Sequence, residues 1–194
     1  MRAEFPGFRL GSVLATSFTG TLSERRGDSL ERIPTPERLV EWLAVSGLAV
    51  DSCTTAQLEL AWELREAIHA AATAAATQDA LPAAAVRIIN DRSTDGRAAA
   101  VLTPEGERRW RLSSASRVED ALGVIAADAI GIISGERDGK LALCASPTCQ
   151  AAFFDTSQSR TRRWCDMNTC GNRQKKARFI ANQRKKTGSA SQGE

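Results

Sequence analysis

The chain has 194 residues, 42% of them hydrophobic, so it can bury a sizeable core and is not a wholly disordered protein. Aromatic residues make up only 5% and tyrosine is absent, which favours small-residue packing between helices over an aromatic-rich β-sandwich. No apolar run approaches the roughly 18 residues of a transmembrane helix, and the first residues do not resemble a secretory signal. We therefore expect a soluble cytoplasmic protein.

The formal charge of +3 is unevenly distributed along the chain. Residues 1–143 carry 16 Lys and Arg against 20 Asp and Glu, a charge of −4, whereas residues 144–194 carry 10 against 3, a charge of +7. A basic end on a mildly acidic body is typical of a module that faces nucleic acid. A solvated basic tail would have the same composition, so charge alone leaves both interpretations open.

Local patterns in residues 1–140 predict a mostly helical α+β domain with a small β-hairpin. Residues 13–18 mix β-branched and apolar side chains and are predicted to be extended. Thr35 followed by Pro36 is a typical helix start, since proline is favoured at the first helical position. The predicted helices cover 36–46, 56–77, 82–90 and 117–135, and the predicted hairpin strands cover 98–102 and 109–112.

Four of the five cysteines form two close pairs, Cys144 with Cys149 and, after 15 intervening residues, Cys165 with Cys170. Cysteines at this spacing in an intracellular chain are more typical of metal ligands than of disulfides. Zn²⁺ prefers four thiolate or imidazole ligands in a tetrahedron, and two pairs supply them. We predict one Zn²⁺ bound by all four thiolates. A closed tetrahedron has no position for water, so this zinc should be structural.

The segment around the cysteines is predicted to form a treble-clef-like zinc finger over residues 141–186. Residues 150–154 and 162–165 are predicted to be the strands of a hairpin, and a helix is predicted to follow the second pair and run through Arg184. So small a module buries little apolar surface, so the metal should supply much of its folding energy. Residues 187–194 are polar and are predicted to be a disordered tail.

Basic residues surround this finger and suit nucleic acid, because lysine and arginine bind phosphate and arginine also matches the guanine edge. Ala177, Ile180 and Ala181 are expected to pack inward, which leaves the basic side chains outward. A solvated face, or one that docks on the acidic body, would show the same pattern. The residues expected to contact DNA are Arg160, Arg162 and Arg163 on the hairpin, and Arg173, Lys175, Lys176 and Arg178 on the helix.

The segment from Cys165 to Arg173 reads CDMNTCGNR, follows RRW, and resembles the CGNR zinc-finger family. The first cysteine pair and the FDTS segment over 154–157 fit the same family. Upstream segments are similar to the ABATE domain that usually precedes this finger: TPERL over 35–39, WL over 42–43, GL over 47–48 and LREAI over 64–68. The resemblance implies zinc at the four cysteines, DNA contact through the neighbouring basic residues, and the role of a bacterial transcription regulator linked to stress.

We therefore expect a zinc-dependent, DNA-binding transcription regulator at the nucleoid, whose body senses a small molecule, forms a homodimer, or both. The alternative is a zinc-stabilised protein-interaction module without direct nucleic-acid binding, and a basic face would also suit RNA. No enzyme is expected, since no recognisable catalytic group or nucleotide-binding motif is present. His69 lies on an alanine-rich helix and is expected to be non-functional, and Cys53 is expected to be an idle thiol.

Overall fold

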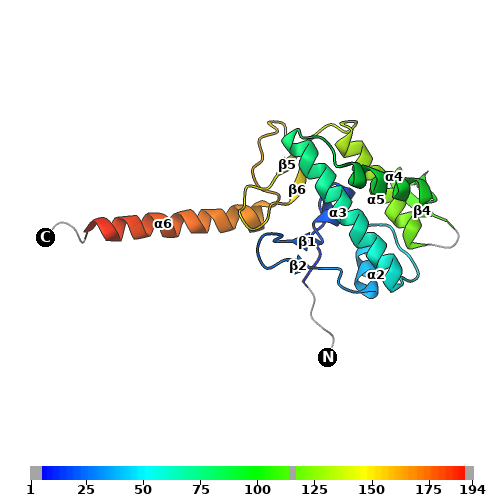
Figure 1. Ribbon diagram of the computed structural model, residues 1–194, viewed down its shortest axis with the longest axis horizontal. Coiled ribbons are helices and arrows are strands. Elements are labelled where there is room, and N and C mark those ends of the chain that lie inside the picture. The colour runs from blue at the N-terminus through cyan, green and yellow to red at the C-terminus, as the bar shows by residue number, and fades with distance from the viewer. Residues whose placement is uncertain (1–5, 114–116, 191–194) are drawn as a thin grey trace, which may run out of the picture.

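The computed structural model describes residues 6–113 and 117–190, in which helices form a body accompanied by three two-stranded antiparallel sheets (Figure 1). This confirms the predicted α+β class with a small finger at the C-terminal end. The helices are α1 (Leu14–Thr19), α2 (Pro36–Val45), α3 (Thr55–Thr77), α4 (Ala83–Asp95), α5 (Val118–Ile133), the π-helical turn η1 (Met167–Gly171) and α6 (Asn172–Ala190). The strands are β1 (Leu22–Ser23), β2 (Leu30–Glu31), β3 (Ala98–Leu102), β4 (Arg108–Leu112), β5 (Lys140–Leu143) and β6 (Ala152–Asp155).

Helix α3 is the centre of the body and packs against α1, α2, α4 and α5. Its start is fixed by a capping box: the Thr54 hydroxyl accepts the Gln57 N–H at 3.2 Å, and the Gln57 side chain accepts the Thr54 N–H at 2.9 Å. Trp42 of α2 is the largest fully buried side chain, and its ring centroid lies 5.2 Å from that of Phe18. The core is otherwise rich in alanine, as the composition indicated.

A very close helix contact forms where α4 ends on α5. A Cβ atom added to Gly96 would lie 2.6 Å from the Gly123 Cα, so both positions require glycine. Helix α4 runs to Asp95, beyond the end predicted at residue 90. Its last turn is held by the Thr94 hydroxyl, which donates to the Asn90 carbonyl at 2.9 Å, and the helix ends at the close contact of Gly96 with α5.

The prediction of extended structure over residues 13–18 is wrong, because most of them form α1. The Asp128 carboxylate of α5 accepts the Ala15 N–H at 2.8 Å and so satisfies a free donor at the start of the helix. Ala15 and Phe18 are both fully buried in the body core. A cap from a residue 113 positions away cannot be read from a local pattern.

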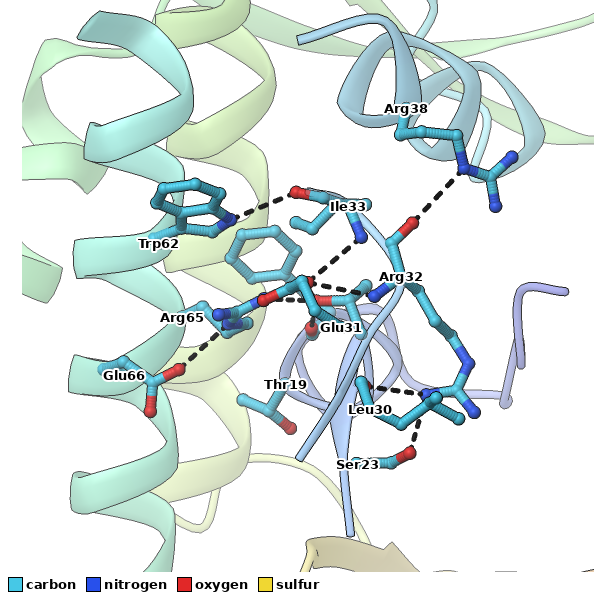
Figure 2. A network of polar contacts seen from close by, with 12 residues as sticks. Thr19, Ser23, Leu30, Glu31, Arg32, Ile33, Arg38, Trp62, Arg65 and Glu66 are labelled. Atoms are coloured by element: carbon cyan, nitrogen blue, oxygen red, sulfur yellow. Dashed lines mark hydrogen bonds and ion pairs between the residues drawn. The ribbon is translucent and has the colours of Figure 1, made fainter. Parts of the chain in front are cut away.

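The short β1–β2 hairpin, which the sequence did not predict, is fastened to α3 by a polar network (Figure 2). Arg65 of α3 donates to the Glu31 carboxylate at 2.8 Å, and the Trp62 indole N–H donates to the Ile33 carbonyl at 3.1 Å. Arg32 is also buried and donates to the Ser23 hydroxyl at 2.6 Å. These contacts fix the position of the loop between the two strands.

Helix α6 extends away from the body (Figure 1). It runs to Ala190, past the predicted end at Arg184 and into the segment expected to be disordered, and residues 191–194 lie outside the described part of the chain. The expectation that Ala177, Ile180 and Ala181 pack inward is wrong, because all three are exposed on this projecting helix.

Within the two described ranges, no helix is both long enough and apolar enough to cross a membrane.

Candidate metal centre and nucleic-acid interface

The β5–β6 hairpin presents the first two cysteines at its tip. Cys144 directly follows β5, and its N–H donates to the Ala151 carbonyl at 2.9 Å. The Cys149 N–H donates to the Ser146 carbonyl at 3.2 Å, and Gln150, with a φ of 46°, reverses the chain into β6. This tight turn brings the two sulfur atoms to the same side of the hairpin end.

The predicted hairpin between residues 150–154 and 162–165 is wrong in its pairing, because β6 pairs with β5 and the later residues form no strand. Asp155 ends β6, and its carboxylate accepts the N–H groups of Ser157 and Arg162, both at 2.9 Å. Burial alone would raise the pKa of Asp155, but these hydrogen bonds outweigh it and hold the pKa below its ordinary value. The charged Asp155 thus turns the chain toward the second cysteine pair.

The second pair leads directly into α6. Cys165 precedes Asp166, whose carboxylate accepts the Asn168 N–H at 2.7 Å and caps the turn η1. Cys170 lies within this turn and is fully buried. A thiolate at the start of a helix is favoured by the partial positive charge of the free N–H groups there. The position and direction of α6 are therefore tied to the metal centre.

The four sulfur atoms converge on one point and lie within 4.8 Å of one another. The sulfur of Cys165 lies 3.6 Å from that of Cys149 and 3.7 Å from that of Cys170. A tetrahedron with Zn–S bonds of about 2.3 Å has sulfur atoms about 3.8 Å apart. The four cysteines therefore fit one structural Zn²⁺, as predicted, and leave no ligand position open.

The electrostatic surroundings of the four cysteines also favour a bound cation. Burial, followed by the charges of Cys149 and Cys144, raises the pKa of Cys170 to about 12. Neighbouring thiols also raise the pKa of Cys165, whereas the hydrogen bonds from Cys149 and Cys165 lower that of Cys144. Protein groups alone would thus keep only part of the set ionised. A divalent cation makes all four thiolates favourable, and its binding releases protons.

Arg162, predicted to contact DNA, is exposed and also makes contacts within the finger. Its Nε atom donates to the Trp164 carbonyl at 3.1 Å, and its Nη2 atom donates to the Cys165 carbonyl. The guanidinium also lies 5.1 Å from the centre of the Phe153 ring, within range of a cation–π contact. These contacts position the chain that carries Cys165.

The other two basic residues of this loop differ in their surroundings. Arg160 forms an ion pair with Asp138 at 2.5 Å, which ties the loop to the turn before β5. Arg163 is exposed, with its guanidinium 5.4 Å from the centre of the Trp164 ring. Of the three loop arginines, Arg163 is the one whose side chain makes no hydrogen bond or ion pair with the described residues.

The first basic residue of α6, Arg173, is engaged with the body. Its Nη1 atom lies 2.6 Å from the Glu24 carboxylate and 3.0 Å from the Thr148 hydroxyl. The hydrogen bond from Arg173, helped by that from Thr148 and opposed by burial, lowers the pKa of Glu24. Sequence reasoning missed both Glu24 and Thr148, because no local pattern relates residues that lie 149 positions apart.

The remaining three predicted residues, Lys175, Lys176 and Arg178, are exposed on α6. None of them has a hydrogen bond or ion pair with any residue that the structure describes. The neighbouring Phe179 is also 64% exposed. The structure thus brings the four cysteines together, uses three of the arginines in contacts within the chain, and leaves an uncompensated basic surface on α6.

His69 and Cys53 do not belong to the four-cysteine cluster. Burial, followed by the charge of Arg25, lowers the pKa of His69 to about 4, so the imidazole is neutral near neutral pH. Burial, followed by the charge of Glu119, raises the pKa of Cys53 to about 11, so its thiol stays protonated. The Cys53 thiol donates to the Thr54 carbonyl at 3.3 Å.

Two family models match the chain. Residues 12–136 match ABATE, described as "Putative stress-induced transcription regulator", and residues 140–183 match the CGNR zinc finger. Both matches confirm the resemblance seen in the sequence. A comparison with curated proteins gives no match. The second matched range contains all four cysteines and most of α6, and the first contains Glu24.

Proposed function

The chain belongs to the ABATE family and ends in a CGNR zinc finger, and on this premise we propose that it is a stress-responsive transcription regulator that binds DNA through α6. In this proposal the zinc fixes the start of α6, and the body senses a small molecule or forms a homodimer. The protein acts in the cytoplasm at the nucleoid and is not an enzyme.

The observation that carries the proposal is the unpaired basic surface of α6, formed by Lys175, Lys176 and Arg178. Helix α6 has 19 residues and projects from the body, so a second macromolecule can reach it from several sides (Figure 1). The major groove of B-DNA is about 12 Å wide and admits an α-helix. Like charges close together on one helix repel, and DNA phosphates would relieve this repulsion.

A salt titration of binding to random-sequence duplex DNA tests this proposal. Each phosphate contact contributes about 0.9 to the slope of log K against log salt concentration. If both lysines contact phosphates, Lys175→Ala with Lys176→Ala should weaken binding and reduce the slope by about 1.8. Alanine preserves helix propensity, so α6 should remain folded.

The matched control is Arg109→Ala with Arg111→Ala. Both arginines are exposed on β4, which lies at the opposite end of the molecule from α6 (Figure 1), and this pair of substitutions removes the same charge. The control should keep the wild-type slope, and EDTA-treated protein should lose the binding that depends on a folded finger. If both double variants lose the same DNA affinity and the same salt slope, net charge alone explains the effect. That result would argue against α6 as the contact surface.

The second candidate function is a protein-interaction module, favoured by the exposed apolar side chains of α6. Phe179 is 64% exposed and Ile180 is 41% exposed. This candidate predicts a zinc-loaded protein without salt-dependent DNA binding. It also predicts a protein complex that resists nuclease treatment and is lost on Phe179→Ala.

A further inference from the structure

At the junction of body and finger, two donors converge on one carboxylate oxygen. The Arg173 Nη1 atom donates to Glu24 Oε2 at 2.6 Å, and the Thr148 hydroxyl donates to the same oxygen at 2.6 Å. Arg173 and Thr148 belong to the finger, whereas Glu24 belongs to the body. A guanidinium and a hydroxyl that point at one anionic oxygen can bind a phosphate oxygen in the same way.

The position of Arg173 suits a DNA phosphate in particular. Arg173 lies one turn before Lys176, so the two side chains are neighbours along one side of α6. It is the second residue of α6, which continues directly from the turn η1. Its side chain is 45% exposed despite the ion pair, so an incoming phosphate can reach it.

We propose that Arg173 and Thr148 form a phosphodiester-binding site of the finger, and that the Glu24 carboxylate occupies this site in the DNA-free protein. The inference rests on the proposed DNA binding by α6 and adds a regulatory element to it. The body competes with DNA for the finger, because a phosphate that binds both the Arg173 Nη1 atom and the Thr148 hydroxyl must displace Glu24.

The body holds Glu24 in this position through its backbone. The Arg26 N–H donates to the Thr148 carbonyl at 3.0 Å, and a Cβ atom on Gly27 would lie 3.2 Å from the Thr148 Cβ. Glu24 has a φ of 53°, and its carbonyl accepts the N–H groups of Gly27 at 2.8 Å and Ser29 at 3.1 Å. The loop therefore docks on the first cysteine turn, and the contact involves more than a pair of exposed side chains.

This loop is in turn fixed to the centre of the body. Arg25 forms an ion pair with Glu66 of α3 at 2.5 Å, and the following strand β2 is held by the pair of Arg65 with Glu31 (Figure 2). The chain of contacts runs from α3 through the β1–β2 hairpin to the finger. A change in the body that moves this hairpin would therefore change the accessibility of Arg173.

The test is the binding of random-sequence duplex DNA by the zinc-loaded wild-type chain and by Glu24→Gln, which removes the competing charge with little change in shape. Release of Arg173 should tighten binding on the order of three- to tenfold at low salt and steepen the salt slope by about 0.9, the contribution of one phosphate contact. Glu41→Gln is the matched control. Glu41 is an exposed residue of α2 that pairs with Arg38, so this variant loses the same charge without changing the finger.

The Arg173→Ala background completes the design, because Glu24→Gln should have no further effect once Arg173 is absent. Zinc content and far-UV circular dichroism show that each variant is folded. Equal affinities of the Glu24→Gln and Glu41→Gln variants, or weaker binding by Glu24→Gln, would overturn the inference and leave DNA binding intact. Absence of binding by every variant, including Glu24→Gln, would instead overturn the proposed function together with the inference.

Discussion

The Arg65 guanidinium has a side-chain exposure of only 5%, and it pairs with Glu31 at 2.8 Å and with the neighbouring Glu66 at 2.9 Å. Removing one partner of a buried pair costs roughly 3–5 kcal/mol, because it leaves a charge without compensation. An apolar residue at this position would pack but would not select where β2 lies on α3. We infer that the buried charge determines the position of the β1–β2 hairpin more than it adds to stability.

His69 gives a prediction about pH at the same scale. Its pKa is about 4 in the folded protein and about 6.5 in an unfolded chain. Between these values the unfolded state binds more protons, so the free energy of unfolding should fall as the pH decreases from about 6.5 toward about 4. Partial solvent screening limits the His69 contribution to about 1–3 kcal/mol.

Urea unfolding of wild type and of His69→Gln at several pH values measures this contribution. Acid also protonates the cysteines and the buried carboxylates, but both proteins share these effects, so their difference isolates His69. The wild-type curve should be steeper between pH 6.5 and 4. Parallel curves for the two proteins would show that His69 titrates with its ordinary pKa.

Among the elements, the β5–β6 hairpin belongs to two cores at once. Leu141 and Phe154, which are paired across the hairpin, lie in the body core, whereas Phe153 lies in the smaller cluster around the cysteines, packed by Ala142. This division follows from the alternation of side chains along a strand. The hairpin therefore packs on the body core with one face and on the cysteine cluster with the other, so it fixes the position of the metal centre relative to the body.

The adjacent phenylalanines of β6 form a matched pair for testing this division. Phe154→Ala removes a side chain that is 6% exposed and should lower the free energy of unfolding of the zinc-loaded protein by roughly 3–5 kcal/mol. Phe153→Ala should instead weaken zinc binding most, since Phe153 packs against the cysteines. Denaturant unfolding and competition with a chelator measure the two quantities. Identical effects of both substitutions on both quantities would contradict the alternation.

The elements that could be predicted from the sequence carry their signals locally. Helix α2 starts with Thr35 and Pro36, and α3 starts at the capping box of Thr54 and Gln57. The zinc ligands were predictable for the same reason, because the spacing within each pair is short. Where the prediction failed, the deciding contact was distant in sequence, such as the Asp128 cap on α1.

The candidate interface shows the same limit. The basic residues of α6 could be identified from composition, but which of them are accessible depends on partners elsewhere in the fold. Arg173 is paired with Glu24, and Arg160 with Asp138, whereas Lys176 is unpaired within the described residues. Charge counting cannot separate these cases, because it assigns the same value to a paired and an unpaired cation.

At the scale of the whole molecule, the ABATE match ends at residue 136 and the zinc-finger match begins at residue 140. The hydrophobic packing nevertheless continues across this boundary. Strand β5 contacts α3, and β6 contacts both α1 and α3. Leu141, Ala152 and Phe154 are part of the same buried cluster as Trp42 and Leu122. The finger and the body therefore share a hydrophobic core, and their folding should be coupled.

Removal of the metal tests this coupling. Without zinc the cysteine turn between β5 and β6 loses its main constraint, so the hairpin should pack less firmly on α3 and the body should melt earlier. If the free energy of unfolding falls by about 3 kcal/mol, the thermal midpoint of a chain of this length should fall by roughly 6–12 °C. Far-UV circular dichroism at 222 nm reports mainly on the helices of the body. EDTA should lower this midpoint, added zinc should restore it, and Cys144→Ser should show the lower value with or without EDTA. A midpoint that is the same with and without zinc would mean that the body core is complete without the cysteine turn.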